Sequence, residues 1–151
     1  MAKTWVQIRV DLLGGCGIEC KPQPGRIIAV GPRHSFAAFS EAVDGAFARY
    51  DLGHLHGFEL KGDRYIGIPD DDWPEPEWED EATLNVAKEV SAGDVFAYTF
   101  DFGDNWEHRC TVLPDKLDPT LDLGGAPPAP LVIDGWGWIP DQYGRESYDA
   151  D

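Results

Sequence analysis

Five side chains of this chain have the types and the spacing that could perform metal-assisted chemistry. Asp101, Asp104 and His108 fall within eight consecutive residues, and His54 and His56 stand two positions apart. Carboxylates and imidazoles together suit a divalent transition metal, and water bound to such a metal can attack a substrate. One hypothesis is therefore a metal-dependent hydrolase that uses Asp101, Asp104 and His108 with His54 or His56.

A structural role for the same residues is the favoured interpretation. Aspartates in turns commonly accept hydrogen bonds from backbone amides of their own turn, and buried histidines usually have satisfied polar atoms. On this interpretation Asp101 and Asp104 bind amides of their turn, His108 packs against Phe100, and Trp106 is buried. We therefore predict no bound cofactor and no metal, and keep Asp101, Asp104 and His108 only as weak candidate metal ligands.

Residues 95–112, which contain most of these side chains, are predicted to form a β-hairpin. Two alternating stretches rich in β-branched and aromatic residues flank the turn signal Gly103-Asp104-Asn105. A three-residue loop over 103–105 would place Phe102 opposite Trp106, and an odd loop leaves one face of the hairpin almost wholly apolar. Gly103 or Asn105 would tolerate the positive φ of such a loop. The candidate binding residues are Asp101, Phe102, Gly103, Asp104, Trp106 and His108, with His54 and His56 from an earlier segment.

The elements that must position this hairpin can be read from the spacing of apolar residues. Alternation predicts strands over 5–12 and 26–30, a hairpin over 58–68 and a short strand over 83–86, whereas residues 35–50 have a helical apolar stripe with Ser35 as cap. The predicted fold is α+β, with a mainly antiparallel sheet of five or six strands and one principal helix packed on a face. We expect a single domain over 1–151, with 4–113 as core and 114–151 as an irregular Pro/Gly/Trp-rich tail packed on it.

Composition restricts the partners of this domain. The 151 residues contain 28 acidic and 12 basic residues, a net charge of −16 that disfavours direct nucleic-acid binding. No segment has the pattern of a signal peptide or a membrane span, and the odd set of three cysteines suits a reducing, cytoplasmic compartment. The acidic stretch 70–81 is expected to be a solvated loop, yet its Trp73 and Trp78 must either fold back on the body or contact an unknown protein partner.

Residues 98–108 resemble the signature Tyr-x-Tyr-Asp-Phe-Gly-Asp-x-Trp-x-His of the root-inducing-plasmid open-reading-frame-three-like family, whose members include insertion-element passenger proteins. Residues 35–50 are similar to the first helix of that family, 51–58 to its Asp-x-x-His-Leu-x-x-Phe turn, and 125–128 to its Pro-Pro step. After that step Ala129, Pro130 and Leu131 replace the acidic residues and Gly-Gly pair of the family, and its nearby cysteines are absent.

The resemblance implies a compact α+β fold and an association with plasmids or mobile elements, without a settled activity. The favoured function is a non-catalytic binding or accessory module. The alternative is the metal-dependent hydrolase that would use the Asp101/Asp104/His108 cluster.

Overall fold

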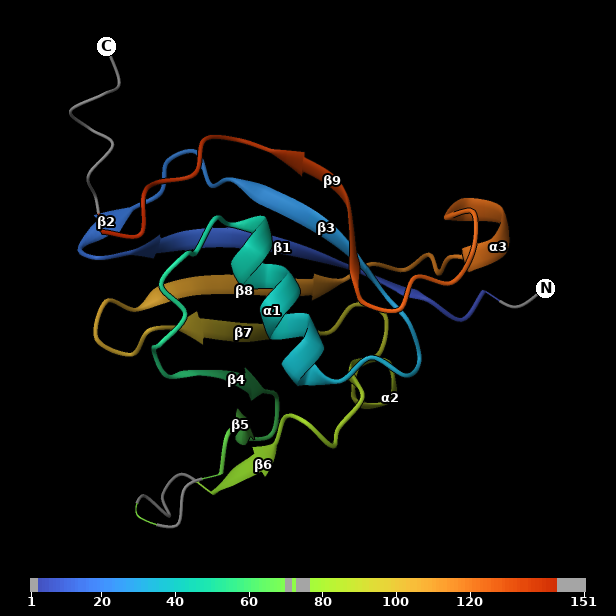
Figure 1. Cartoon of the computed structure of the whole chain (residues 1–151), viewed down its shortest axis with the longest axis horizontal. Helices are drawn as coiled ribbons and strands as arrows, with labels where there is room; N and C mark the ends of the chain where they lie inside the picture. Colours follow the sequence, from blue (N-terminus) through green and yellow to red (C-terminus); the bar gives the residue numbers. More distant parts are fainter. Residues whose placement is uncertain (1–2, 70–71, 73–76, 144–151) are drawn as a thin grey trace.

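The computed structural model describes residues 3–69, 72 and 77–143 (Figure 1). Within these residues one nine-stranded sheet dominates, in the order β6-β5-β4-β7-β8-β1-β3-β9, with the short β2 paired to the end of β1. The pair β5–β6 is parallel and the remaining pairs are antiparallel. The strands are β1 (Val6–Gly15), β2 (Ile18–Glu19), β3 (Gly25–Val30), β4 (His56–Leu60), β5 (Arg64–Gly67), β6 (Trp78–Asp80), β7 (Val95–Phe100), β8 (Trp106–Val112) and β9 (Leu131–Trp136).

The expected α+β architecture of five or six strands with one principal helix is wrong. The described residues hold nine strands in one mixed sheet and three short helices, α1 (Phe36–Ala46), α2 (Val86–Glu89) and α3 (Pro119–Asp122). The predicted strand over 83–86 is also wrong, because α2 begins at Val86.

Two of the additional strands come from segments that were expected to be irregular. β6 lies in the acidic stretch and pairs with β5, and β9 lies in the tail and pairs with β3. Each satisfies backbone groups of a neighbouring strand, a source of stability that does not require alternating apolar residues. Residues 70–71, 73–76 and 144–151, with Trp73 among them, lie outside the described residues, so the expectation of a solvated loop is not tested there.

Helix α1 lies across one face of the sheet and covers the core (Figure 1). It begins as predicted, because the Ser35 hydroxyl oxygen accepts a hydrogen bond from Ala38 N at 3.1 Å. The predicted apolar stripe is buried at Phe36, Phe39, Val43 and Phe47, whereas Tyr50 is 51% exposed. Against this stripe pack the buried side chains of the central strands, which include Ile8, Val10, Leu12, Ile28, Phe58, Ile66, Phe96, Tyr98 and Cys110.

The hairpin over 95–112 forms with the predicted faces but with a longer loop. Phe100 pairs with Trp106 and Tyr98 with His108, so the loop spans five residues, 101–105, instead of three. Both loops are odd, which is why the side chains of one face remain buried in the core as expected. Positive φ occurs at Asn105 (55°) and at Asp101 (64°), not at Gly103.

The face of the sheet opposite α1, called here the open face, carries exposed or half-buried side chains such as Glu59, Ala97 and Arg109. The tail covers one part of this face, since a Cβ on Gly25 would lie 2.3 Å from the Trp136 ring and the Arg9 guanidinium lies 4.9 Å from the centroid of that ring. In the described residues no helix has the length and apolar character needed to cross a bilayer.

Candidate functional site

The loop 101–105, called here the signature turn, is organised by Asp101. The Asp101 Oδ1 atom accepts hydrogen bonds from Gly103 N at 3.0 Å and Asp104 N at 3.3 Å, while the Asp101 N–H donates to the Leu55 carbonyl at 2.8 Å. The prediction that Asp101 binds amides of the turn is therefore confirmed, whereas the same prediction for Asp104 is wrong, because Asp104 contributes an N–H and not its carboxylate. Asp101 is the first residue after β7, and its carboxylate accepts hydrogen bonds from amides two and three residues later, as aspartates in turns commonly do.

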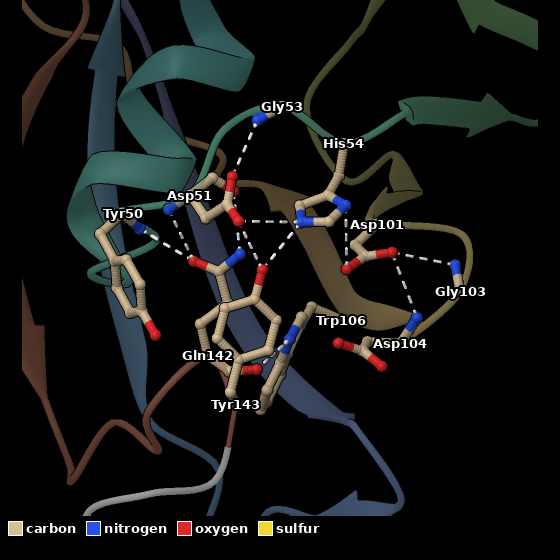
Figure 2. Close-up of polar contacts among 10 residues, drawn as sticks. All are labelled: Tyr50, Asp51, Gly53, His54, Asp101, Gly103, Asp104, Trp106, Gln142 and Tyr143. Atoms are coloured by element: carbon tan, nitrogen blue, oxygen red, sulfur yellow. Dashed lines mark hydrogen bonds and ion pairs between the residues drawn. The ribbon is translucent and has the colours of Figure 1, made fainter.

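His54 connects the signature turn to the C-terminal segment (Figure 2). Its Nδ1 lies 3.5 Å from Asp101 Oδ2, and its Nε2 lies 2.9 Å from the Tyr143 hydroxyl and 3.5 Å from Asp51 Oδ2. The Tyr143 hydroxyl donates to Asp51 Oδ2 at 2.7 Å, so it accepts from His54 Nε2. This hydrogen bond holds the pKa of Asp51 below its usual value and raises that of Tyr143 to about 12. The cluster is thus a chain of donors and acceptors that joins the turn to the tail.

Gln142 and Trp106 form the buried base of the same cluster (Figure 2). Both side chains are fully buried, and the Trp106 indole N–H donates to the Gln142 carbonyl at 3.2 Å. The Gln142 amide accepts from Tyr50 N and Asp51 N at 2.9 and 3.1 Å and donates to the Asp51 carbonyl at 2.9 Å. The predicted burial of Trp106 is confirmed, and its neighbours show that it supports the docking of the tail.

His108 lies in the core, away from the carboxylates of the signature turn. It is 1% exposed, its Nδ1 lies 3.0 Å from the Tyr98 carbonyl, and its ring packs edge-on against Phe47 at 5.2 Å between centroids. Burial lowers the pKa of His108 to about 4, so the imidazole is neutral at pH 7. The expected packing of His108 against Phe100 is replaced by contacts with Phe47 and Tyr98, because the register differs by two residues from the predicted one.

His56 lies apart from both His54 at the signature turn and His108 in the core. Its Nε2 lies 2.7 Å from Glu81 Oε1, and burial, which lowers the pKa of His56, is outweighed by the carboxylates of Glu81 and Asp44, so that its pKa is raised. His54, His56 and His108 therefore serve three different sets of contacts. Among the residues that the structure describes, no group of three or more His, Cys, Asp or Glu side chains could hold a metal ion.

Asp104 and Asn105 line an open hollow of about 880 Å³ between the signature turn and the glycine-rich turn 14–17. The Cys16 N–H donates to the Asp104 carbonyl at 2.6 Å and joins the two turns. Burial and the neighbouring Asp104 and Asp101 carboxylates raise the pKa of the Cys16 thiol. A thiol held in its protonated form is a poor nucleophile, so this hollow has no activated cysteine.

Phe102 is the signature residue that faces outward, and it is 41% exposed. Its ring lies beside that of Trp78 at 6.1 Å between centroids and 27° between planes, on the open face of the sheet. Trp78 can lie flat there because Gly57 and Gly67 pair across strands β4 and β5, and a Cβ on either would come within 2.6 or 2.9 Å of the indole. Tyr65 meets Trp78 edge-on at 5.9 Å.

These rings border a second hollow, of about 320 Å³, which we call the aromatic hollow. Sequence reasoning placed Phe102 among the binding candidates but did not find Trp78, Tyr65 or the two glycines as its partners. The available signal was a tryptophan in an acidic stretch, which had to fold back or contact a partner, together with Gly67 in the predicted hairpin and Gly57 just before it. The aromatic hollow is lined by Gly57, Phe58, Glu59, Tyr65, Trp78, Ala97, Thr99 and Phe102.

Comparisons with known proteins found a matching family, a similar protein sequence and a similar solved structure. The family described as plasmid pRiA4b ORF-3-like protein has a model that matches residues 5–142. The uncharacterized protein y4hQ of Sinorhizobium fredii (strain NBRC 101917 / NGR234) is 28% identical over 90 residues, which cover 59% of this chain and 43% of that protein. The chain thus matches less than half the length of that relative.

Among solved structures, the chain is similar to a crystal structure of MM3350, a protein of unknown function from Methanosarcina mazei Go1. The TM-score is 0.66 with 21% sequence identity, and the match covers 87% of this chain and 68% of that one. At this level of identity the likeness concerns the fold.

Proposed function

This chain belongs to the plasmid pRiA4b ORF-3-like protein family, and we propose that it acts as a non-catalytic binding module. The observation that carries the proposal is the position of Phe102, an apolar signature residue that is 41% exposed and lies beside Trp78 at the aromatic hollow. Exposed aromatic side chains that form a continuous surface are typical of binding sites, where Trp and Tyr are the favoured anchors.

The polar residues of the signature support this proposal because their contacts are structural. Asp101 organises the backbone of the signature turn, and His108 is a neutral core side chain. His54 ties the turn to Tyr143 of the tail. We infer that these contacts hold the signature turn in place, and that the role of the turn is to keep the Phe102 ring exposed.

A partner protein is the class of ligand that we favour. The net charge of −16 opposes the approach of a phosphate backbone and supports a partner with basic groups. The three cysteines are free thiols, which supports a reducing, cytoplasmic setting for the interaction. An accessory role within a plasmid or other mobile element is part of the same proposal and is supported by the description of the family.

Selection from a displayed peptide library tests the binding module directly. We expect peptides selected on the purified chain to lose binding to Phe102→Ala and to keep it on Leu121→Ala, because Leu121 is 81% exposed on the separate helix α3. The proposal would be overturned if the library yields no binder, or if every selected peptide binds Phe102→Ala as well as it binds the unchanged chain.

The rival metal-dependent hydrolase has a separate test. Purified chain is analysed for bound metal and heated with manganese, zinc or calcium, alone and as the Asp104→Ala variant. We expect the melting temperature of both proteins to respond equally to each ion, since Asp104 and His108 lie in separate environments. Stoichiometric metal, with a rise in melting temperature that disappears in Asp104→Ala, would replace the binding module by the hydrolase.

A further inference from the structure

The aromatic hollow has the shape of a site for one compact group. Of the residues that line it, Trp78, Phe102 and Tyr65 contribute aromatic rings, whereas Ala97 and Thr99 of β7, called here the floor, contribute little bulk. Thr99 pairs with Gly57 of β4, which has no side chain at this position. A hollow with ring faces and edges on its sides and little bulk beneath can accept a group that enters from solvent.

The charge around the aromatic hollow selects the sign of that group. Glu59 lies across from Ala97 in the β4–β7 pair, its side chain is exposed, and it forms no ion pair within the part of the chain that the structure describes. Arg109 of β8, which pairs with Ala97, is already engaged by Gln23 at 3.1 Å and by Asp11 at 3.5 Å. The hollow therefore combines aromatic rings with an uncompensated carboxylate in a chain of net charge −16.

We propose that the aromatic hollow binds the positively charged side chain of a basic partner segment, which would lie against the exposed parts of the Trp78 and Phe102 rings and beside the carboxylate of Glu59. Aromatic faces attract ammonium and guanidinium groups through the negative potential of the ring, most strongly for tryptophan. The carboxylate adds a charge of the opposite sign and steers basic partners toward this face. The inference rests on the proposed binding function and names the chemistry of the partner.

Matched small probes test this inference on the full chain. Choline carries a compact cation, and dimethylbutanol is its uncharged carbon analogue of the same shape. We expect saturable binding of choline, measured by calorimetry or by movement of the Trp78 indole resonance, and no comparable binding of dimethylbutanol. Phe102→Ala should weaken choline binding by about 2- to 30-fold, the range of a single cation–ring contact.

Three further variants make the test specific. Ala97→Leu places a larger side chain on the floor, at an exposed position where the strand tolerates it, and should block choline without removing a ring. Glu59→Gln should weaken choline and leave dimethylbutanol unchanged. Trp138→Ala, at a tryptophan that is 65% exposed on the tail, is the matched control and should bind choline normally.

Two outcomes would overturn the inference. Equal binding of choline and dimethylbutanol would show an apolar site without a preference for cations, and choline binding that survives in both Phe102→Ala and Ala97→Leu would place the cation elsewhere. Either outcome leaves the binding module standing if selected peptides still require Phe102. Peptides that require Phe102 but lack Lys and Arg would likewise refute the cationic partner alone.

Discussion

The carboxyl group of Asp44 allows a quantitative test of the core packing. Asp44 lies on α1 and is 6% exposed, and its Oδ1 accepts a hydrogen bond from the Tyr98 hydroxyl of β7 at 2.8 Å. Burial raises its pKa to about 7, although Tyr98, His56 of β4 and Arg49 after α1 each lower it; Glu81 after β6 raises it further. Burial, followed by the neighbouring Asp44 carboxyl, raises the pKa of Tyr98 well above its usual value, so Tyr98 remains the donor.

The sign of the resulting pH dependence follows from the two states of the chain. In the unfolded chain the Asp44 carboxyl has its ordinary pKa of 3.8, and in the folded chain a pKa of about 7. Between these values the folded protein holds a proton that the unfolded chain releases, so stability falls as pH rises through this window. Each pH unit corresponds to about 1.4 kcal/mol, and the whole window to at most about 4 kcal/mol. The contribution is fully present below pH 3.8 and lost above pH 7.

Asp44→Asn isolates this contribution, because the amide has the size of the carboxyl and can still accept from Tyr98 without ionising. We expect urea unfolding to give similar free energies for both proteins at about pH 4 and a more stable variant at about pH 8, by up to about 4 kcal/mol. Asp63→Asn, in the exposed β4–β5 turn, is the control for the loss of one negative charge. If the free-energy difference between Asp44→Asn and the unchanged chain is constant from about pH 4 to about pH 8, the burial argument for Asp44 is refuted.

Three further predictions concern the signature turn, the tail and the aromatic hollow. Asp101→Ala should lower the free energy of unfolding by about 1–3 kcal/mol because two turn amides lose their acceptor. Asp104→Ala should change the free energy of unfolding by less than about 0.5 kcal/mol. Denaturation curves that show the reverse order would restore Asp104 as the organising residue. Gln142→Ala should cost about 1–3 kcal/mol because backbone groups of Tyr50 and Asp51 lose their hydrogen-bond partner, and an unchanged unfolding midpoint would mean that the tail docks without it. Gly57→Ala should displace the Trp78 ring, since the added Cβ would lie 2.6 Å from it, and a fluorescence quencher should then reach Trp78 more readily; unchanged quenching would show that the indole does not lie on the glycine.

The parts of the fold that follow a local pattern were predictable from the sequence. The strand over 5–12, the helix cap at Ser35 and the apolar face of the 95–112 hairpin each follow from period or cap chemistry within one segment. The loop length of that hairpin was wrong because it depends on the positive φ of Asp101, which its hydrogen bond to Leu55 helps to hold. That contact joins two segments far apart in the chain, and no local pattern reports it.

The candidate site was predictable to a smaller extent for the same reason. Phe102 and Trp106 were named from the signature, and Trp106 is buried as expected. The ring beside Phe102 belongs to Trp78, which reaches it through a parallel pair, β5–β6, that sequence alternation does not predict. Likewise β9 pairs with the edge of β3, a contact between segments far apart in the chain that no local pattern reports.

The strand order has a consequence for how the protein is made. β1 lies between β3 and β8, so the edge of β1 that faces β8 stays unpaired until β8 has been synthesised. The outer edge of β3 stays unpaired for longer, until β9 has been synthesised. Pairings between segments distant in sequence form slowly and leave strand edges open to aggregation during translation. A nascent chain of this protein therefore carries two unpaired strand edges, one on β1 and one on β3, until residues 106–112 and 131–136 have been synthesised.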